Sequence, residues 1–301
     1  MIVVSLSKFS KYYNVGYGVF DINLNINKGE VYGILGSNGS GKSTILRHLM
    51  GFSKPSSGSC KINGMEVFDQ YYKILNNVGY VPGEVHFPKD IKVREYLDMF
   101  IKLRNIKDLD RVRTLVKRFK LNYDMVLSDM SFGQKRRIAI VIAFMHDPDI
   151  LILDEAVSGL DPIMQLEFVK LLKEEKRAGK TILLSSHTFR EISAVCDRVA
   201  IIKNGKIVDE LVLDDLEHNK DKTFELSFDE LVIMNNFIKR CSTLGFIKVI
   251  SYDYNTLKCR IGFNDEDINN VILILSKYKI VKFREDKVSL KKYFLSFYDL
   301  S

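Results

Sequence analysis

The sequence predicts an α/β fold with a mainly parallel sheet, followed by a small α+β domain. Up to about residue 210, apolar runs that resemble strands alternate with amphipathic helical stretches, as in a parallel sheet covered on both faces. A glycine-rich turn follows the strand expected at 31–35. After a charged stretch at 211–222, the expected order becomes strand, helix, strand, strand, helix, strand. This βαββαβ order is typical of a ferredoxin-like domain.

Each element of the larger domain follows from its local pattern of apolar residues, caps and turns. In order, we expect strands within 1–35, a helix over 42–50 closed by Gly51, strand-like runs within 60–82, helical spacing over 92–121, a helix from about 131, and strands at 150–153, 181–185 and 199–202. The helix between the strands at 150–153 and 181–185 is well marked, because Asp161 suits its N-cap and Pro162 its first turn.

The smaller domain is expected to begin after a linker. The turn-rich, charged stretch at 211–222 is interpreted as that linker, which divides the chain into domains at 1–212 and 223–301. The elements expected in the second domain are strand 223–228, helix 229–244, strands 246–252 and 256–263, helix 265–278, strand 279–285 and a final amphipathic helix over 289–300.

Composition indicates a globular protein and excludes some classes. The 301 residues are 46% hydrophobic and 28% charged, which disfavours disorder and coiled coil. A net charge of +7 suits an anionic ligand, a membrane surface or nucleic acid without choosing among them. The scattered cysteines indicate reduced thiols. The N-terminus resembles a strand more than a signal peptide, and no apolar run reaches the about 18 residues of a membrane span.

A phosphate-binding loop is predicted at 36–44, which satisfies the pattern G-x-x-x-x-G-K-[ST]. Its glycines let backbone N–H groups turn toward phosphate oxygens, and the following helix adds its positive N-terminal end. Lys42 is expected to contact the β- and γ-phosphates, and the Ser43 hydroxyl to bind Mg²⁺. The loop lies between an apolar strand and a helix, which supports a nucleoside triphosphate site. The residues of the site are Gly36, Ser37, Asn38, Gly39, Ser40, Gly41, Lys42, Ser43 and Thr44.

Hydrolytic residues are predicted at two neighbouring strand ends. Asp154 and Glu155 follow the buried strand at 150–153, whose end belongs at the ligand edge of an open α/β sheet. Asp154 is expected to hold Mg²⁺, and Glu155 to accept a proton from the attacking water. Without the phosphate loop, an exposed acidic pair would be the preferred interpretation. His187 follows the strand at 181–185 and is placed to reach a γ-phosphate, although a lone histidine is more often structural.

These residues together resemble the ATP-binding cassette family over roughly residues 1–210. The discriminating stretch is Met-Ser-Phe-Gly-Gln at 130–134, which is similar to the family's Leu-Ser-Gly-Gly-Gln signature ahead of a helix. The resemblance implies a P-loop NTPase cassette with an antiparallel β subdomain and a helical subdomain at about 85–148. It also implies that ATP and Mg²⁺ are the ligands.

The resemblance implies that a second ATP-binding subunit completes each site. Ser131, Gly133 and Gln134 would meet the γ-phosphate held by the opposite subunit, since Ser131 at an N-cap leaves backbone N–H groups free. Asp161 ends a stretch similar to the family's D-loop and would lie at the dimer interface. The dimer is expected to be either a homodimer or a heterodimer.

One aromatic ring is expected to stack on adenine. Tyr13 falls where the family places this ring, and Tyr12 and Tyr17 are close competitors. Stacking tolerates many rings, so a core or surface tyrosine is the alternative interpretation.

Two positions depart from the family pattern. Gly83 stands where the family usually has glutamine, so it offers no side chain to Mg²⁺ or water. We expect Glu84 or additional water to substitute, which makes Glu84 a further candidate Mg²⁺ ligand. Phe132 replaces the first signature glycine, while Ser131 and Gly133 are retained. The γ-phosphate contact is therefore expected to persist, and coupling through the loop near Gly83 to be altered.

Three functional classes compete. A kinase or GTPase is disfavoured by the signature and by His187. A cassette protein acting on ribosomes or nucleic acid is the alternative, disfavoured by the single cassette and the lack of heptad or zinc-type insertions. We therefore predict the ATP-hydrolysing subunit of a membrane transporter, which works with membrane-spanning permease subunits at the cytoplasmic face of the membrane.

Export is favoured over import by family analogy. A single cassette with a small C-terminal domain is similar to exporter subunits of the drug, bacteriocin and antibiotic-resistance group. The ending at 287–295 resembles their terminal S-L-E-x-x-F helix, although Lys291 replaces the glutamate. The transported substrate and the role of 223–301 are left open by the sequence.

Overall fold

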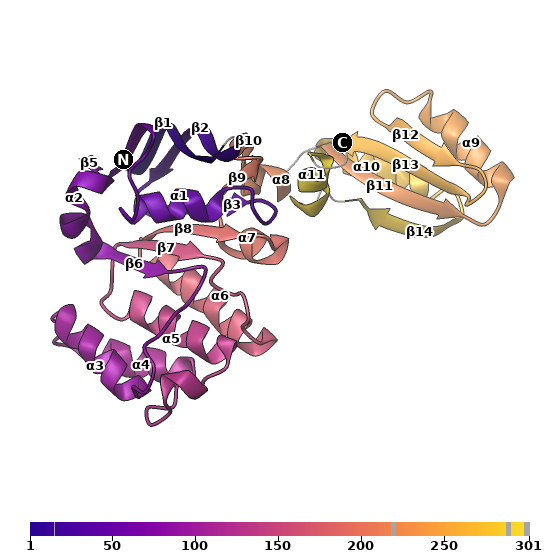
Figure 1. Ribbon diagram of the computed structural model, residues 1–301. Coiled ribbons are helices and arrows are strands. Elements are labelled where there is room, and N and C mark those ends of the chain that lie inside the picture. The colour runs from indigo at the N-terminus through magenta and orange to yellow at the C-terminus, as the bar shows by residue number, and fades with distance from the viewer. Residues whose placement is uncertain (15, 218–220, 287–289, 298–301) are drawn as a thin grey trace. The chain divides into compact units, whose positions relative to one another are not determined.

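The computed structural model describes residues 1–14, 16–217, 221–286 and 290–297 (Figure 1). The chain forms two compact units, Met1–Leu213 and Asp214–Ser301. Each unit has its own apolar core. In the described part of the chain, no helix is both long enough and apolar enough to span a membrane.

A six-stranded sheet in the order β10-β9-β3-β8-β7-β6 forms the centre of the first unit. All neighbouring strands are parallel except β9 and β10, which are antiparallel. Strands β3, β7 and β8 are buried along their full length, which explains their continuous apolar sequences. The strands are β3 (Val31–Leu35), β6 (Val78–Val81), β7 (Ile150–Asp154), β8 (Thr181–Ser186), β9 (Arg198–Lys203) and β10 (Lys206–Val212).

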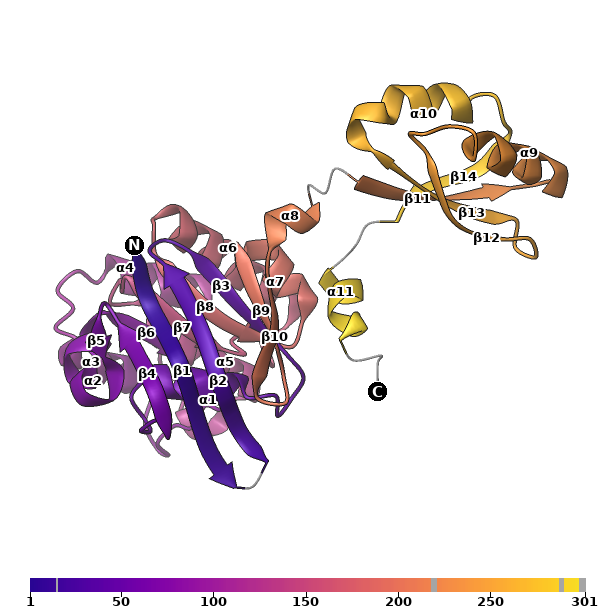
Figure 2. The same cartoon turned by 90° about the horizontal axis from the view of Figure 1, so that it is seen from above.

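A second, antiparallel sheet has the order β2-β1-β4-β5, and Figure 2 shows β2, β1 and β4 side by side. Helix α1 lies between the two sheets, because Ile45 and Leu49 share one core with Leu6 of β1 and Ile152 of β7. The α/β class and the antiparallel subdomain are therefore confirmed. The elements are β1 (Ile2–Asn14), β2 (Tyr17–Asn27), β4 (Ser57–Ile62), β5 (Met65–Glu66) and α1 (Lys42–Leu49).

The remaining helices of this unit correct two predictions. The stretch 92–121 is two helices, because the chain breaks after Leu103 and Asn105 has a left-handed φ of 49°. A helix also lies within 60–82, where aromatic and β-branched residues favoured strands. Its buried residues, Val67 and Ile74, lie two helical turns apart on one face. The helices are α2 (Val67–Ile74), α3 (Val93–Leu103), α4 (Asp110–Arg118), α5 (Phe132–Phe144), α6 (Pro162–Arg177) and α7 (Phe189–Val195), with short 3₁₀ turns at Leu75–Asn77 and Leu127–Asp129.

The second unit has the predicted βαββαβ order. Its sheet order, β12-β13-β11-β14, is antiparallel throughout, as in a ferredoxin-like fold. Leu226, Phe237 and Ile261 are fully buried in its core. The elements are β11 (Asp221–Phe228), α9 (Leu231–Cys241), β12 (Lys248–Asp253), β13 (Lys258–Asn264), a 3₁₀ turn (Asp265–Asp267), α10 (Ile268–Leu275), β14 (Ile280–Glu285) and α11 (Leu290–Ser296).

The predicted linker at 211–222 is mostly structured. It contains the end of β10, helix α8 (Leu213–Glu217) and the start of β11, while residues 218–220 lie outside the described residues. The final helix predicted over 289–300 is described only as α11. Residues 289 and 298–300 of that prediction lie outside the described residues.

Candidate functional site

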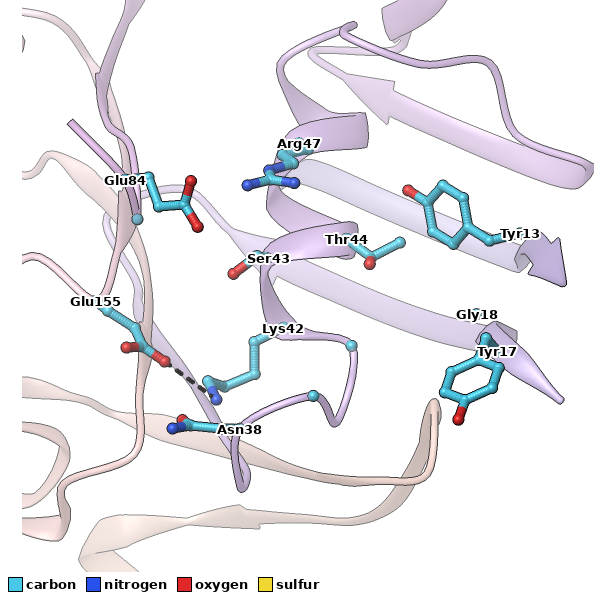
Figure 3. A pocket seen from close by; sticks show the side chains of 13 residues that line it. Tyr13, Tyr17, Gly18, Asn38, Lys42, Ser43, Thr44, Arg47, Glu84 and Glu155 are labelled. Atoms are coloured by element: carbon cyan, nitrogen blue, oxygen red, sulfur yellow. Dashed lines mark ion pairs between the residues drawn. The ribbon is translucent and has the colours of Figure 1, made fainter. Parts of the chain in front are cut away.

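A pocket of about 400 Å³ opens at the carboxyl ends of β3, β6 and β7 (Figure 3). The tip of the β1–β2 hairpin forms its other wall. This position is the usual ligand edge of an open α/β sheet. The pocket is lined by Tyr13, Tyr17, Gly18, Asn38, Gly39, Gly41, Lys42, Ser43, Thr44, Arg47, Gly83, Glu84 and Glu155.

The loop between β3 and α1 depends on its glycines. Gly41 has a φ of 111°, and a Cβ there would lie 2.5 Å from Cγ1 of Val19. At Gly36, a Cβ would lie 2.5 Å from the Ser40 hydroxyl oxygen. The loop therefore curls closely around the start of α1, as the sequence pattern predicted.

Lys42 lies across this loop and is only 4% exposed. Its Nζ donates to the carbonyl oxygens of Gly36 at 2.9 Å and Ser37 at 3.0 Å. Figure 3 shows that the ammonium points toward Glu155, whose Oε1 is 3.3 Å away. A nearly buried cation beside backbone N–H groups at a helix start is suited to bind phosphate.

Asp154 ends β7 and is fully buried. Its Oδ1 accepts a hydrogen bond from the Ser185 hydroxyl at 2.5 Å. Its Oδ2 has no hydrogen-bond partner among the described residues. A buried, unpaired carboxylate oxygen is costly unless a cation or donor satisfies it. The Ser43 hydroxyl lines the pocket, and Asp154 lies next to the lining residue Gly83. Since Mg²⁺ prefers oxygen ligands, these two residues fit the predicted ion.

Glu155 lies between two basic side chains. It leaves β7 with a left-handed φ of 46°, and its N–H donates to the Ser185 hydroxyl oxygen at 3.1 Å. Oε1 faces Lys42, and Oε2 lies 3.4 Å from Nδ1 of His187. The structure thus brings together Glu155, Lys42 and His187, the three residues predicted to be catalytic.

The structure separates the three candidate tyrosines. Tyr13 and Tyr17 line the pocket, and Figure 3 shows both rings at its hairpin side. Tyr12 instead packs against Phe20, with ring centroids 5.6 Å apart. The Nζ of Lys11 lies 5.7 Å from the Tyr13 ring centroid. Tyr13 and Tyr17 therefore remain the candidates for adenine stacking.

The signature residues lie at the start of α5 and outside the pocket of their own chain. Ser131 is the N-cap, as predicted: its Oγ accepts from the N–H of Gln134 at 3.3 Å. The Gln134 Oε1 accepts from the N–H of Ser131 at 2.8 Å. Gly133 packs closely, since a Cβ there would lie 2.4 Å from the Gly159 carbonyl oxygen. Asp161 caps α6 by accepting from the N–H of Met164 at 3.0 Å.

Gly83 and Glu84 both line the pocket. A Cβ at Gly83 would lie 2.8 Å from the unpaired Oδ2 of Asp154, so a side chain at this position would force a shift. The Glu84 side chain is 78% exposed, and its Oε2 lies 3.6 Å from Nε2 of His86. The backbone at Gly83 therefore approaches Asp154 closely.

Arg47 is a pocket residue that the sequence analysis missed. It lies on α1 one turn after Ser43, and Figure 3 shows its guanidinium in the pocket region. A basic residue near the end of a helix normally complements the helix dipole, so its sequence position did not indicate a site. The available signal was its spacing of four residues from Ser43.

Comparison with known proteins gives the family. Residues 19–158 match the ABC transporter family. The bacitracin transport ATP-binding protein BcrA of Bacillus licheniformis is 32% identical over 231 residues, covering 76% of each chain. The methionine import ATP-binding protein MetN 4 of Oceanobacillus iheyensis is 34% identical over 200 residues, covering 63% of this chain and 58% of that protein.

A solved structure of an ATP-binding subunit of an ABC transporter has a TM-score of 0.66 with this chain. The two sequences are 26% identical, and the match covers 72% of this chain and 92% of the chain in that structure. Sequence and fold therefore agree on the family. This chain belongs to the ABC transporter family and is an ATP-binding, ATP-hydrolysing subunit that energises membrane transport.

Proposed function

We propose that ATP binds in the pocket with its phosphates on the loop 36–44, and that Glu155 is the general base for hydrolysis. The observation that carries this proposal is the position of Glu155 between Lys42, at 3.3 Å, and His187, at 3.4 Å. A carboxylate held at the γ-phosphate end of the pocket is placed to accept a proton from an attacking water. The ring of Tyr13 or Tyr17 would stack on adenine.

The other residues stabilise and orient the phosphates. Lys42 gives positive charge to the β- and γ-phosphates, and the backbone N–H groups of the loop bind their oxygens. Ser43 and the unpaired oxygen of Asp154 would hold Mg²⁺. When bound, this ion neutralises charge on the phosphate oxygens. His187 would contact the γ-phosphate from the side of Glu155 and hold the carboxylate in place.

The signature residues act on a second subunit in this proposal. Ser131, Gly133 and Gln134 lie outside their own pocket, and the first N–H groups of the helix that they begin have no acceptor within the helical ladder. In a dimer they would bind the γ-phosphate held by the other subunit, with Asp161 at the interface. ATP would then favour the closed dimer through its higher affinity for that state.

We further propose that the subunit docks on membrane-spanning permease subunits at the cytoplasmic face and drives export. Support comes from the resemblance of a cassette with a small C-terminal domain to exporter subunits. Import is the competing direction. Reconstitution with the permease in vesicles and assay of the direction of ATP-dependent transport tests this proposal.

The catalytic assignment is tested with the purified full chain. Glu155→Gln preserves the shape of the side chain and removes its basicity, so we expect ATP hydrolysis to fall about 100-fold or more. The variant should still bind ATP and should become dimeric when ATP is added, as measured by light scattering after gel filtration. Glu66→Gln, the same change outside the pocket, is the control. Retained hydrolysis by Glu155→Gln would refute the assignment of the base.

A further inference from the structure

Arg136 is a fully buried arginine next to the site. It lies on α5, and its side chain is the largest of those that are fully buried in the described residues. Burial lowers the pKa of its guanidinium, and the carboxylates of Asp154 and Glu155 raise it in return. Burying a charge is costly unless hydrogen bonds and opposite charges compensate. The partners of Arg136 therefore show what this side chain holds in place.

The guanidinium holds the backbone of the loop that follows β6. Its Nη1 donates to the carbonyl oxygen of Pro82, and its Nη2 donates to that of Gly83 at 2.5 Å. Both acceptors are main-chain atoms, so the contact does not need a side chain at position 83. A planar guanidinium with parallel donors fits two adjacent carbonyls better than an ammonium does.

The held loop lies against the predicted Mg²⁺ ligand. At 2.8 Å, a Cβ on Gly83 would be closer to Oδ2 of Asp154 than ordinary van der Waals contact permits. This oxygen is the one without a hydrogen-bond partner among the described residues. The position of the loop therefore sets the space beside Oδ2.

Phe132 contacts both Arg136 and Gly159. Its ring centroid lies 5.2 Å from Cζ of Arg136, one helical turn away, which is within cation–π range. Its ring also lies directly against Gly159, where a Cβ would be 2.2 Å from Cδ1 of Phe132. The side chain that replaces the first signature glycine thus contacts both the D-loop-like stretch and Arg136.

We infer that Arg136 is a positioning residue that holds the loop at Pro82 and Gly83 against Asp154, and that Phe132 links this contact to Gly159 and the signature turn. In this chain the contact of Arg136 with the backbone would couple the signature turn to the loop beside Asp154, a role that a side chain at position 83 would otherwise have. Movement of the start of α5 on dimer closure would then reach the space beside Oδ2 of Asp154. The inference rests on the proposed function, because it assigns Mg²⁺ to Asp154.

The test measures how Mg²⁺ affects nucleotide binding by the full chain. A fluorescent ATP analogue is titrated with and without Mg²⁺ into wild type, Arg136→Met, Arg136→Lys and Phe132→Leu. Arg137→Met is the matched control, because its neighbouring guanidinium donates to the Phe119 carbonyl instead. Thermal unfolding of each variant reports on folding.

Mg²⁺ is expected to change the affinity for the ATP analogue, and Arg136→Met should raise about tenfold the Mg²⁺ concentration that gives half of this change. Loss of residues that hold metal ligands in place commonly weakens metal binding by that amount. Binding without Mg²⁺ should stay at the wild-type value. The half-saturating Mg²⁺ concentration of Arg136→Lys should lie between those of wild type and Arg136→Met. That of Phe132→Leu should also rise, but by less. The matched control should bind as wild type does.

Two results would overturn the inference. One is an unchanged Mg²⁺ response in both Arg136 variants and in Phe132→Leu. The other is an equal loss of binding with and without Mg²⁺, which a purely structural role would cause. If Arg136→Met does not fold, the decision rests on Arg136→Lys and Phe132→Leu. A wild-type chain whose ATP binding ignores Mg²⁺ would contradict the proposed function instead.

Discussion

The imidazole of His187 and the carboxylate of Glu155 face each other across the ends of β8 and β7, with Nδ1 3.4 Å from Oε2. The second oxygen of the carboxylate faces the ammonium of Lys42. Each oxygen therefore has its own basic neighbour, and the orientation of Glu155 is set from both sides. His187 is also 47% exposed, which leaves its ring accessible to a ligand.

Replacing His187 should therefore affect hydrolysis more than binding. We expect His187→Ala to lower kcat about 100-fold, the usual effect of removing one donor that stabilises the transition state. The affinity for ATP should change little, because the phosphate loop is intact. Steady-state ATPase assays and analogue binding measure the two effects separately. A parallel loss of affinity and kcat would show that His187 only maintains the pocket.

Replacing Gly83 by glutamine, the usual residue of the family, should lower Mg²⁺-dependent ATP hydrolysis. A Cβ there meets Oδ2 of Asp154 at 2.8 Å, so both Gly83→Ala and Gly83→Gln must move the loop or the acid. We expect Mg²⁺-dependent hydrolysis to fall about tenfold in both variants. Gly245→Ala is the control, because a Cβ there has no atom within 4 Å. Higher activity in Gly83→Gln would contradict this account.

Tyr13 should contribute to ATP affinity through its ring. Stacking of a base on an aromatic side chain is worth about 1–3 kcal/mol, so Tyr13→Ala should weaken ATP binding at least about fivefold. Tyr13→Phe should bind as wild type does. Tyr12→Ala serves as the control, since Tyr12 packs on Phe20. If Tyr17→Ala alone weakens binding in equilibrium titrations, Tyr17 is the stacking residue.

Glu84 should affect the requirement for Mg²⁺ only moderately. Its carboxylate lines the pocket but is mostly exposed, so it is expected to act through water or by transient contact with the ion. Glu84→Ala should raise severalfold the Mg²⁺ concentration that gives half-maximal hydrolysis. An unchanged Mg²⁺ dependence would remove Glu84 from the site.

His146 should make the first unit less stable in acid. Burial, together with the nearby charges of Arg104 and Arg111, lowers the pKa of this imidazole from 6.5 to about 4. Between these values the unfolded chain binds a proton that the folded chain does not, so stability falls as pH drops from 6.5 to 4. After a discount for partial exposure, the loss is about 1–2 kcal/mol.

Urea unfolding of wild type and His146→Leu between pH 7 and pH 4.5 measures this contribution. The variant lacks the titrating group, so its stability should depend less on pH than that of wild type. Identical slopes in the two proteins would show that other groups govern acid stability.

The pattern of apolar residues predicted most elements but not all of them. The βαββαβ order of the second unit followed from alternation and turns, because β11 and β13 each place every second residue in the core. Helix α2 was missed, since its aromatic and β-branched residues also suit a strand. In the structure the segment is a helix that buries Val67 and Ile74. The break near Asn105 depends on one left-handed residue, which the helical spacing around it concealed.

The sequence by itself determined the phosphate loop, the two acids at the end of β7 and the caps at Ser131 and Asp161. Each of these depends on neighbours within a few residues, so local spacing is sufficient to predict it. Only the tertiary structure decided that Arg136 holds the backbone at Gly83. It also decided that Gly83 meets Asp154 and that Phe132 covers Gly159. These contacts join segments far apart in the chain, and their geometry is set by how the helices pack on the sheet.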